Sequence, residues 1–201
     1  MRLTAEQIYT IPFRNDSEAE IPPFAVLKHA GNVVDRSGQW VASVTKPDTT
    51  FSRLYLVNGP VAIPADAYGL AADGSYPVLV KTETDTPASE TGWGVTAGSW
   101  ALRKNRPGNF SCLGPSKTDV GLFRQEECNS IIGQLTGSLA TGSTQTVNLC
   151  YGDPATTEGT IQATVRDKLL ISGSLPDNTI VAADWINGVW YLKWWVGPCA
   201  A

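Results

Sequence analysis

The chain has 201 residues, of which 42% are hydrophobic and 17% are charged, and its formal net charge is −4. This length allows one large globular domain or two small ones. The acidic balance and the scattered basic residues exclude a general attraction to phosphate backbones, so no nucleic-acid partner is expected. No apolar run approaches the roughly 20 residues that span a bilayer, and no signal-peptide segment opens the chain; synthesis in a cytoplasm and no membrane partner are expected.

Glycine, proline, serine and threonine are spread along the whole length, and no stretch keeps a helical period of apolar residues. This pattern predicts an all-β protein with short strands and many turns. The first group of predicted strands covers residues 8–13, 24–28, 39–44 and 53–57, two short strands joined at Asp73-Gly74, and residues 100–102 and 110–114.

A second series of strands begins near Cys128, which predicts a second domain. Its strands are expected at residues 130–135, 145–151, 160–165 and 169–172, followed by a hairpin over 179–196. The predicted organisation is two small β-barrel or β-sandwich domains: a barrel-like domain over 1–115, a linker over 116–127, and a sandwich over 128–201.

The C-terminal hairpin is the most specific local signal, because Asn187-Gly188 stands between β-branched and aromatic residues and suits a type I′ turn. The implied register pairs Trp185 with Trp190, Ala183 with Leu192, and Val181 with Trp194 on one apolar face. We therefore expect the core of the second domain to contain four side chains from this hairpin: Trp185, Trp190, Leu192 and Trp194.

The opposite face of the hairpin is mixed, since it carries Asp184 against Tyr191, Lys193 and Trp195. An aromatic platform for a sugar or a partner is the alternative to a purely structural reading of these aromatic residues. A polar stretch from Lys81 to Ser99 predicts a long surface loop that would expose Trp93.

The four cysteines, Cys112, Cys128, Cys150 and Cys199, lack the close spacing of zinc ligands, so no metal is predicted. Cys150 and Cys199 each follow a predicted strand and would be neighbours if those strands pair. A reducing compartment favours free thiols over a disulfide between them.

Catalytic patterns are weak throughout. The single histidine, His29, stands at a predicted strand end, and no serine or cysteine lies in a nucleophile pattern. Gly137 and Gly142 have P-loop spacing without its lysine, and Gly92-Trp-Gly94 lacks the context of a dinucleotide site, so no cofactor is predicted. A glycosidase based on paired carboxylates stays open, with these candidates: Asp66, Asp73, Glu83, Asp85, Glu90 and Asp184.

Two passages resemble structural proteins of tailed bacteriophages and prophages. Residues 13–27 run from a polar turn through Ile-Pro into an apolar strand, and residues 59–80 are similar to small barrels of capsid decoration and head–tail proteins. Residues 94–110 fit the downstream pattern of that family, and residues 172–195 resemble terminal domains of neck, tail or fibre proteins. The resemblance implies a virion protein without catalytic residues, located on a capsid, neck or tail.

This resemblance predicts a non-enzymatic structural protein that assembles with itself and with other virion proteins. Interfaces of this kind use aromatic and aliphatic groups left over from the cores. The candidates are Trp93, Phe51, Tyr191, Lys193 and Trp195. A carbohydrate-binding module that recognises a host-surface glycan through Trp93 or the 190–195 strand is the alternative.

Overall fold

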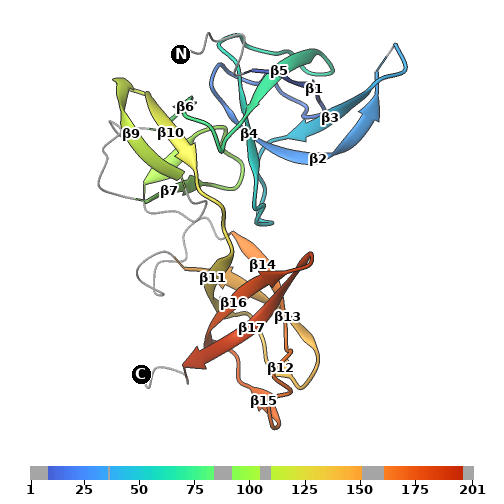
Figure 1. The fold of residues 1–201 in the computed structure, drawn as a ribbon, viewed down its shortest axis with the longest axis vertical. Helices are drawn as coiled ribbons and strands as arrows, with labels where there is room; N and C mark the ends of the chain where they lie inside the picture. Colours follow the sequence, from blue (N-terminus) through green and yellow to red (C-terminus); the bar gives the residue numbers. More distant parts are fainter. Residues whose placement is uncertain (1–8, 36, 84–91, 105–109, 151–160, 197–201) are drawn as a thin grey trace. The chain divides into compact units, whose positions relative to one another are not determined.

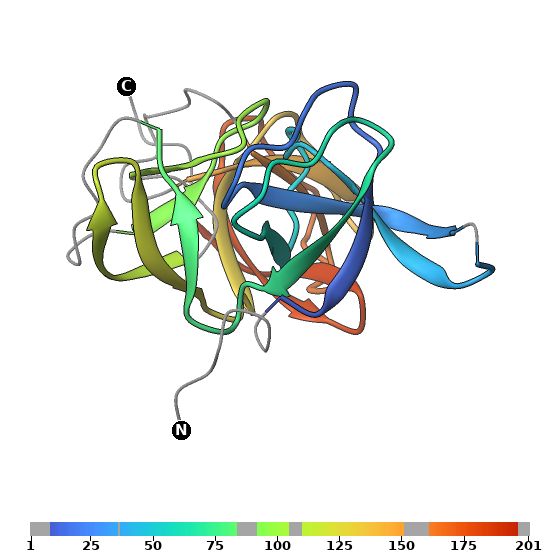
Figure 2. The ribbon, with the colours of Figure 1, turned by 90° about the horizontal axis from the view of Figure 1, so that it is seen from above.

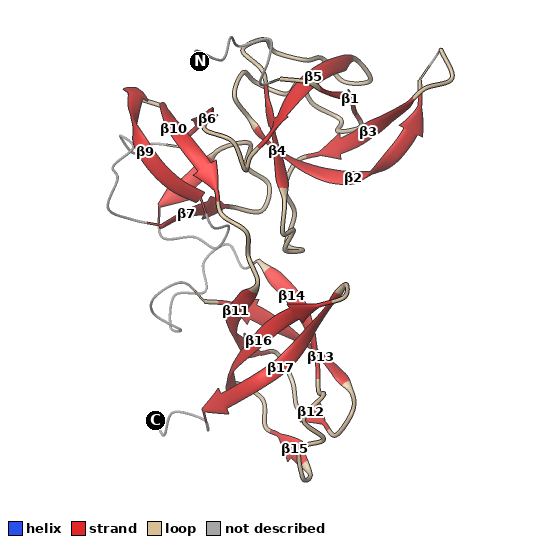
Figure 3. Cartoon of the chain, in the orientation of Figure 1, coloured by secondary structure: helices blue, strands red, loops and turns tan. Residues whose placement is uncertain are grey.

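The computed structural model describes residues 9–35, 37–83, 92–104, 110–150 and 161–196. Within these ranges the regular structure consists of strands, without a helix (Figure 3). The all-β prediction is confirmed. Since the described part contains no helix, it has no helix that is long and apolar enough to cross a membrane.

The chain divides into two compact units, and the second is built from two separate pieces of sequence. The first unit comprises Met1–Asp48 and Ser52–Glu127, and the second comprises Thr49–Phe51 and Cys128–Ala201. The segment Thr49–Phe51 therefore belongs structurally to a barrel whose five strands all come much later in the chain.

The first unit begins with a closed five-stranded barrel (Figure 1). Its strand order is β1-β3-β2-β4-β5, in which β1 and β3 are parallel. The core is filled by alternate strand residues such as Phe13, Leu27 and Val44, which are fully buried. The strands are β1 (Ile11–Asn15), β2 (Val26–Val34), β3 (Trp40–Thr45), β4 (Tyr55–Asn58) and β5 (Tyr68–Asp73).

The β2–β3 hairpin continues beyond this barrel as a two-stranded ribbon (Figure 2). β2 pairs with β4 only over Val26–Lys28, and β3 pairs with β1 only over Ala42–Val44. We call the outer part, residues 31–34 and 40–41, the arm. Its strands pair only with each other, so both edges of the ribbon lack a further strand among the described residues.

A second sheet completes the first unit, in the order β6-β10-β9-β7-β8. An isolated parallel bridge between Thr82 and Leu102 joins its two outer strands at one end. The buried Gln125 side chain connects this sheet to the barrel, because it accepts a hydrogen bond from Tyr55 N and donates to Arg53 O, both at 2.9 Å. The strands are β6 (Val78–Lys81), β7 (Gly92–Val95), β8 (Leu102–Lys104), β9 (Phe110–Lys117) and β10 (Val120–Gln125).

Two expectations for this region are corrected. The stretch 116–127, expected to be a linker, contains β10, whose Phe123 is buried. Trp93, expected in an exposed loop, lies in β7 with 1% of its surface exposed and packs edge-on against Phe123 at 5.4 Å between ring centroids. The reason is tertiary: Trp93 stands between two glycines in a stretch rich in polar residues, and its aromatic partners, Phe110 and Phe123, come from strands later in the chain.

The second unit is a closed five-stranded barrel, in the order β11-β13-β14-β17-β16, accompanied by a small two-stranded sheet of β12 and β15. One neighbouring pair, β14 and β17, is parallel. The barrel strands are β11 (Ser130–Leu135), β13 (Thr144–Leu149), β14 (Gln162–Arg166), β16 (Ile180–Ile186) and β17 (Val189–Val196). The small sheet consists of β12 (Leu139–Ala140) and β15 (Ser174–Leu175).

The C-terminal hairpin forms around Asn187-Gly188, whose φ angles of 48° and 89° are the positive values that a type I′ turn requires. Trp185 pairs with Trp190 and Ala183 with Leu192, as the sequence predicts. A β-bulge between Ala182 and Ala183 then shifts the register, so Val181 pairs with Trp195 and Ala182 pairs with Trp194. Trp194, expected in the core, is 41% exposed for this reason.

The predicted strand over 169–172 is instead a loop fixed by a buried carboxylate. Asp167 is buried and accepts hydrogen bonds from the backbone N–H groups of Gly142, Leu169 and Ile171 at 2.8, 2.9 and 3.2 Å. Leu170 has a φ of 52° in this loop. A carboxylate bonded to several backbone donors holds the chain in a turn, which overrides the extended preference of Leu-Leu-Ile.

Candidate binding pocket of the second barrel

The pocket lies beside β14, which has one parallel neighbour at its start and a different one at its end. Gln162 at the start of β14 pairs with Thr50: its N–H donates to Thr49 O at 2.5 Å, and Phe51 N donates to its carbonyl at 2.7 Å. At the other end of β14, Val165 and Arg166 pair with Trp190 and Tyr191 of β17. A cavity of about 320 Å³ adjoins this change of partner. Its lining is Thr50, Phe51, Thr144, Ala163, Thr164, Arg166, Trp185, Gly188, Val189 and Trp190.

Three aromatic rings form one side of the cavity. Trp190 is buried, and its ring centroid lies 5.0 Å from that of Trp185 and 6.0 Å from that of Phe51. Trp185 and Phe51 are half-buried. Their rings are tilted or edge-on to Trp190, which is the preferred geometry of aromatic pairs, so the arrangement is rigid.

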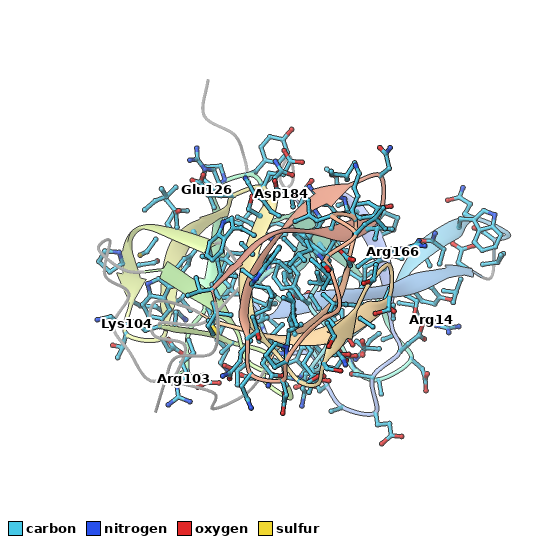
Figure 4. All side chains as sticks on the ribbon, turned by 90° about the horizontal axis from the view of Figure 1, so that it is seen from below. Arg14, Arg103, Lys104, Glu126, Arg166 and Asp184 are labelled. Carbon is cyan, nitrogen blue, oxygen red and sulfur yellow. The ribbon has the colours of Figure 1, made fainter. Side chains whose placement is uncertain are left out.

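Uncharged polar side chains and one arginine form the other side. β13 and β14 pair Thr144 with Arg166, Thr146 with Thr164, and Asn148 with Gln162. Residues directly opposite in an antiparallel pair share a face, so these six side chains form one outer polar surface. Across this pair of strands, Gln162 Nε2 donates a hydrogen bond to Asn148 Oδ1 at 2.9 Å. Arg166, labelled in Figure 4, is exposed at the rim of the barrel.

The expected interface residues of the last strand lie elsewhere on this barrel. Tyr191 is half-buried under Lys168, whose Nζ is 5.2 Å from the ring centroid. Lys193 is exposed and forms an ion pair of 3.0 Å with Asp184 (Figure 4 labels Asp184). Trp195 is 42% exposed. These three side chains do not line the cavity, whereas Phe51, Trp185 and Trp190 do.

Asp184 is held in its charged form by its neighbours. Its carboxylate accepts a hydrogen bond from Ser130 Oγ at 2.6 Å and faces the Lys193 ammonium. The bond from Ser130, followed by the bond and charge of Lys193, lowers the pKa of Asp184 below its ordinary value. Such a residue is an ion-pair member on the barrel surface, without the raised pKa expected of a general acid.

Exposed apolar side chains of the first unit gather at two places among the described residues, the arm and the barrel. On the arm, Trp40 lies opposite Val34, and these side chains are 71% and 49% exposed. On the barrel, an apolar hollow of about 320 Å³ is lined by Tyr9, Asn58, Gly59, Pro60, Val61, Ile63 and Leu70. Burial raises the pKa of the Tyr9 hydroxyl.

The candidate catalytic groups are dispersed in the part of the chain that the structure describes. His29 is exposed on β2, where its Nε2 lies 3.1 Å from Asn32 Oδ1. Glu83 lies 3.8 Å from Arg103, Asp66 occupies a turn, and Asp73 ends β5. Asp85, Glu90 and Cys199 lie outside the described residues, so the expected proximity of Cys150 and Cys199 stays a prediction. No group of three or more His, Cys, Asp or Glu side chains in the described ranges could hold a metal ion.

No protein-family model, curated protein or solved structure matches the chain. The site is therefore assigned from its own residues. Sequence reasoning missed Trp40, Arg166, Thr144 and Thr164. A signal for Thr164 and Arg166 exists, because Gln162, Thr164 and Arg166 alternate with the apolar Ala163 and Val165 and mark the outer face of a strand.

Proposed function

We propose that the protein is a non-enzymatic structural component of a tailed phage particle, where it assembles as a homo-oligomer on the capsid, neck or tail. The observation that carries this proposal is the arm, an apolar ribbon that leaves its own barrel. Three stretches of the sequence resemble virion proteins and support the same role: residues 13–27, 59–80 and 172–195. The division of the chain into two β domains supports it as well. The protein would be made in the host cytoplasm and located in the virion.

An arm of this kind needs a partner for physical reasons. A two-stranded ribbon has marginal stability in water, because it offers too little buried surface to offset the ordering of its backbone. Trp40 and Val34 add exposed apolar area at the end that lacks other strands. Packing against another chain would bury both side chains and hydrogen-bond an open ribbon edge.

The apolar hollow of the first barrel is the proposed seat of the arm in a second copy. Val61 and Leu70 on its wall are exposed, and nearly all its lining is aliphatic, aromatic or backbone. An arm that enters a different patch on the next copy makes a head-to-tail contact, and such contacts close into rings when the rotation allows. A closed ring matches the rotational symmetry of a neck or tail, and it also matches that of a capsid vertex or face.

The oligomer is tested by sedimentation of the full chain and its variants. We expect Trp40→Ser on the arm and Leu70→Lys in the hollow each to dissociate the oligomer, with circular dichroism unchanged. Trp194→Ser is the matched control, since it removes an exposed tryptophan of the second unit that is not among the expected interface residues. A monomeric wild type, or an oligomer that survives both first-unit variants, would contradict assembly through the arm.

The particle role is tested separately, by mass spectrometry and electron microscopy of purified virions. We expect the protein in intact particles, in a fixed number of copies per particle. Its absence from purified particles would overturn the structural function, whatever its oligomeric state in solution.

A receptor- or carbohydrate-binding role is the second candidate, and the pocket of the second barrel is the observation that favours it. The aromatic residues involved differ from those expected from the sequence, because Trp93 is buried and Trp195 lies away from the cavity. The two roles are compatible, since an adsorption protein is also part of the particle.

A further inference from the structure

We propose that the second barrel binds an acidic saccharide, one that carries a carboxylate such as a uronic or sialic acid, in the pocket between Phe51, Trp185 and Arg166. This inference specifies the ligand of the carbohydrate-binding candidate and rests on that candidate. It is independent of the arm and of assembly.

The polar surface of β13 and β14 has the chemistry of a saccharide contact. Thr144, Thr146 and Thr164 present hydroxyl groups, and Asn148 and Gln162 present amides. Hydroxyls and amides both donate and accept hydrogen bonds, as the hydroxyl groups of a sugar require. Thr144 and Thr164 also line the cavity, so this surface continues into it.

The aromatic side of the cavity supplies the apolar contact. Trp185 and Phe51 are half-buried, and each is fixed by its contact with the buried Trp190. Rigid aromatic rings lose little conformational entropy on binding, and they can cover the apolar C–H face of a sugar ring. The cavity of about 320 Å³ is at the lower end of the usual ligand-pocket range of roughly 300–1,000 Å³, so it suits one or two sugar units.

Arg166 determines the charge of the ligand. It lines the cavity, and among the described residues that line it Arg166 is the only charged one. In the described part of the chain its guanidinium forms no ion pair, whereas Arg14, Arg53, Arg103 and Arg124 each have a carboxylate partner. A guanidinium binds a carboxylate through two parallel hydrogen bonds, so an uncompensated arginine beside an aromatic cavity favours an anionic ligand.

The connectivity of the barrel agrees with this location. The polar surface belongs to β13 and β14, the second and third strands of a five-stranded closed barrel, and the cavity extends to the β16–β17 turn at Gly188. Small Greek-key barrels of the oligonucleotide/oligosaccharide-binding kind use the face of their second and third strands and the loop between the fourth and fifth. A nucleic-acid ligand would need several cations along its phosphates, but Arg166 is the only cation that the described residues contribute to the cavity lining.

The test is saturation-transfer and ¹H–¹⁵N NMR of the full chain with four saccharides. Two are acidic, tetragalacturonic acid and 3′-sialyllactose, and two are neutral counterparts, galactotetraose and lactose. We expect an acidic saccharide to bind and to shift the indole N–H resonance of Trp185, which a Trp185→Phe variant assigns. The neutral counterpart should bind at least about tenfold more weakly, the loss that corresponds to one charge-assisted hydrogen bond.

Two variants locate the site without removing a core residue. Arg166→Gln should weaken binding of the acidic saccharide about tenfold, and Thr164→Val should weaken it about fivefold. Arg124→Gln is the matched control, an exposed arginine on β10 of the first unit, and it should leave binding unchanged.

Three results would overturn the proposal. The first is that neither acidic saccharide binds at millimolar concentration. The second is that the neutral counterparts bind equally well and Arg166→Gln has no effect. The third is that a deoxythymidine oligonucleotide binds more tightly than any saccharide. None of them affects the sedimentation or virion experiments, so failure here leaves the structural function standing.

Discussion

The Trp190 ring contacts two aromatic side chains that come from distant parts of the sequence: Trp185, with ring centroids 5.0 Å apart, and Phe51, at 6.0 Å. This contact joins the C-terminal hairpin to the Thr49–Phe51 segment within one barrel. We expect Trp190→Ala to lower the free energy of unfolding of the second unit by about 3–5 kcal/mol, the usual cost of removing a buried tryptophan. Denaturation followed by fluorescence measures it. Trp195→Ala, at an exposed position of the same strand, should cost less than about 1 kcal/mol, and equal losses would contradict the packing.

Asp167 holds the loop after β14 through three backbone N–H groups, those of Gly142, Leu169 and Ile171. Asp167→Ala would leave these donors without their acceptor in a buried site. We expect a loss of about 3 kcal/mol, since an unsatisfied buried donor costs roughly 1–3 kcal/mol and water would reach part of the loop. Urea denaturation measures the loss. Asp177→Ala, at an exposed position, is the control, and a similar loss in both variants would refute this role.

Gly133 on β11 lies close to the backbone of β13. A Cβ atom at this position would be 2.7 Å from the carbonyl oxygen of Asn148, and a backbone atom cannot move aside as a flexible side chain can. We expect Gly133→Ala to destabilise the barrel by about 1–3 kcal/mol through the forced shift of a strand. Thermal denaturation measures it. Ile132→Ala, at the exposed neighbouring position, should have a smaller effect. A larger loss of stability in Ile132→Ala than in Gly133→Ala would contradict the close approach of β11 to β13.

Stability of the second unit should depend on pH through Asp184. The pKa of Asp184 is lowered by the hydrogen bond from Ser130 and by Lys193. A folded-state pKa below the unfolded value, which is about 3.9, gives stabilisation that is present above that value and is lost as pH falls through the folded pKa. The stability difference between wild type and Asp184→Asn should therefore decrease below about pH 4.

Urea denaturation between pH 2.5 and 6 provides this measurement, and carboxyl NMR titration gives the pKa of Asp184 directly. A titration at or above the ordinary aspartate value, or a stability difference that stays constant over this range, would contradict the observed ion-pair geometry. Because the site is at the surface, high salt should reduce the effect.

The sequence by itself determined the all-β class and the most local feature, the hairpin at Asn187-Gly188. Both follow from short-range physics: turn residues set the backbone, and alternation separates the two faces of a strand. The pairs nearest the turn, Trp185 with Trp190 and Ala183 with Leu192, follow from the same rule.

Only the tertiary structure decided how far from the turn the regular pairing of the hairpin continues, and which side chains form a site. The bulge at Ala182 and Ala183 moved Trp194 to the surface, and the packing of Phe123 buried Trp93 in β7. The pocket brings Phe51 to Arg166 and Trp185, residues more than a hundred positions away, because Thr49–Phe51 pairs with β14. Strand pairing between distant segments depends on the whole set of apolar faces that must be buried together, and no local pattern contains that information.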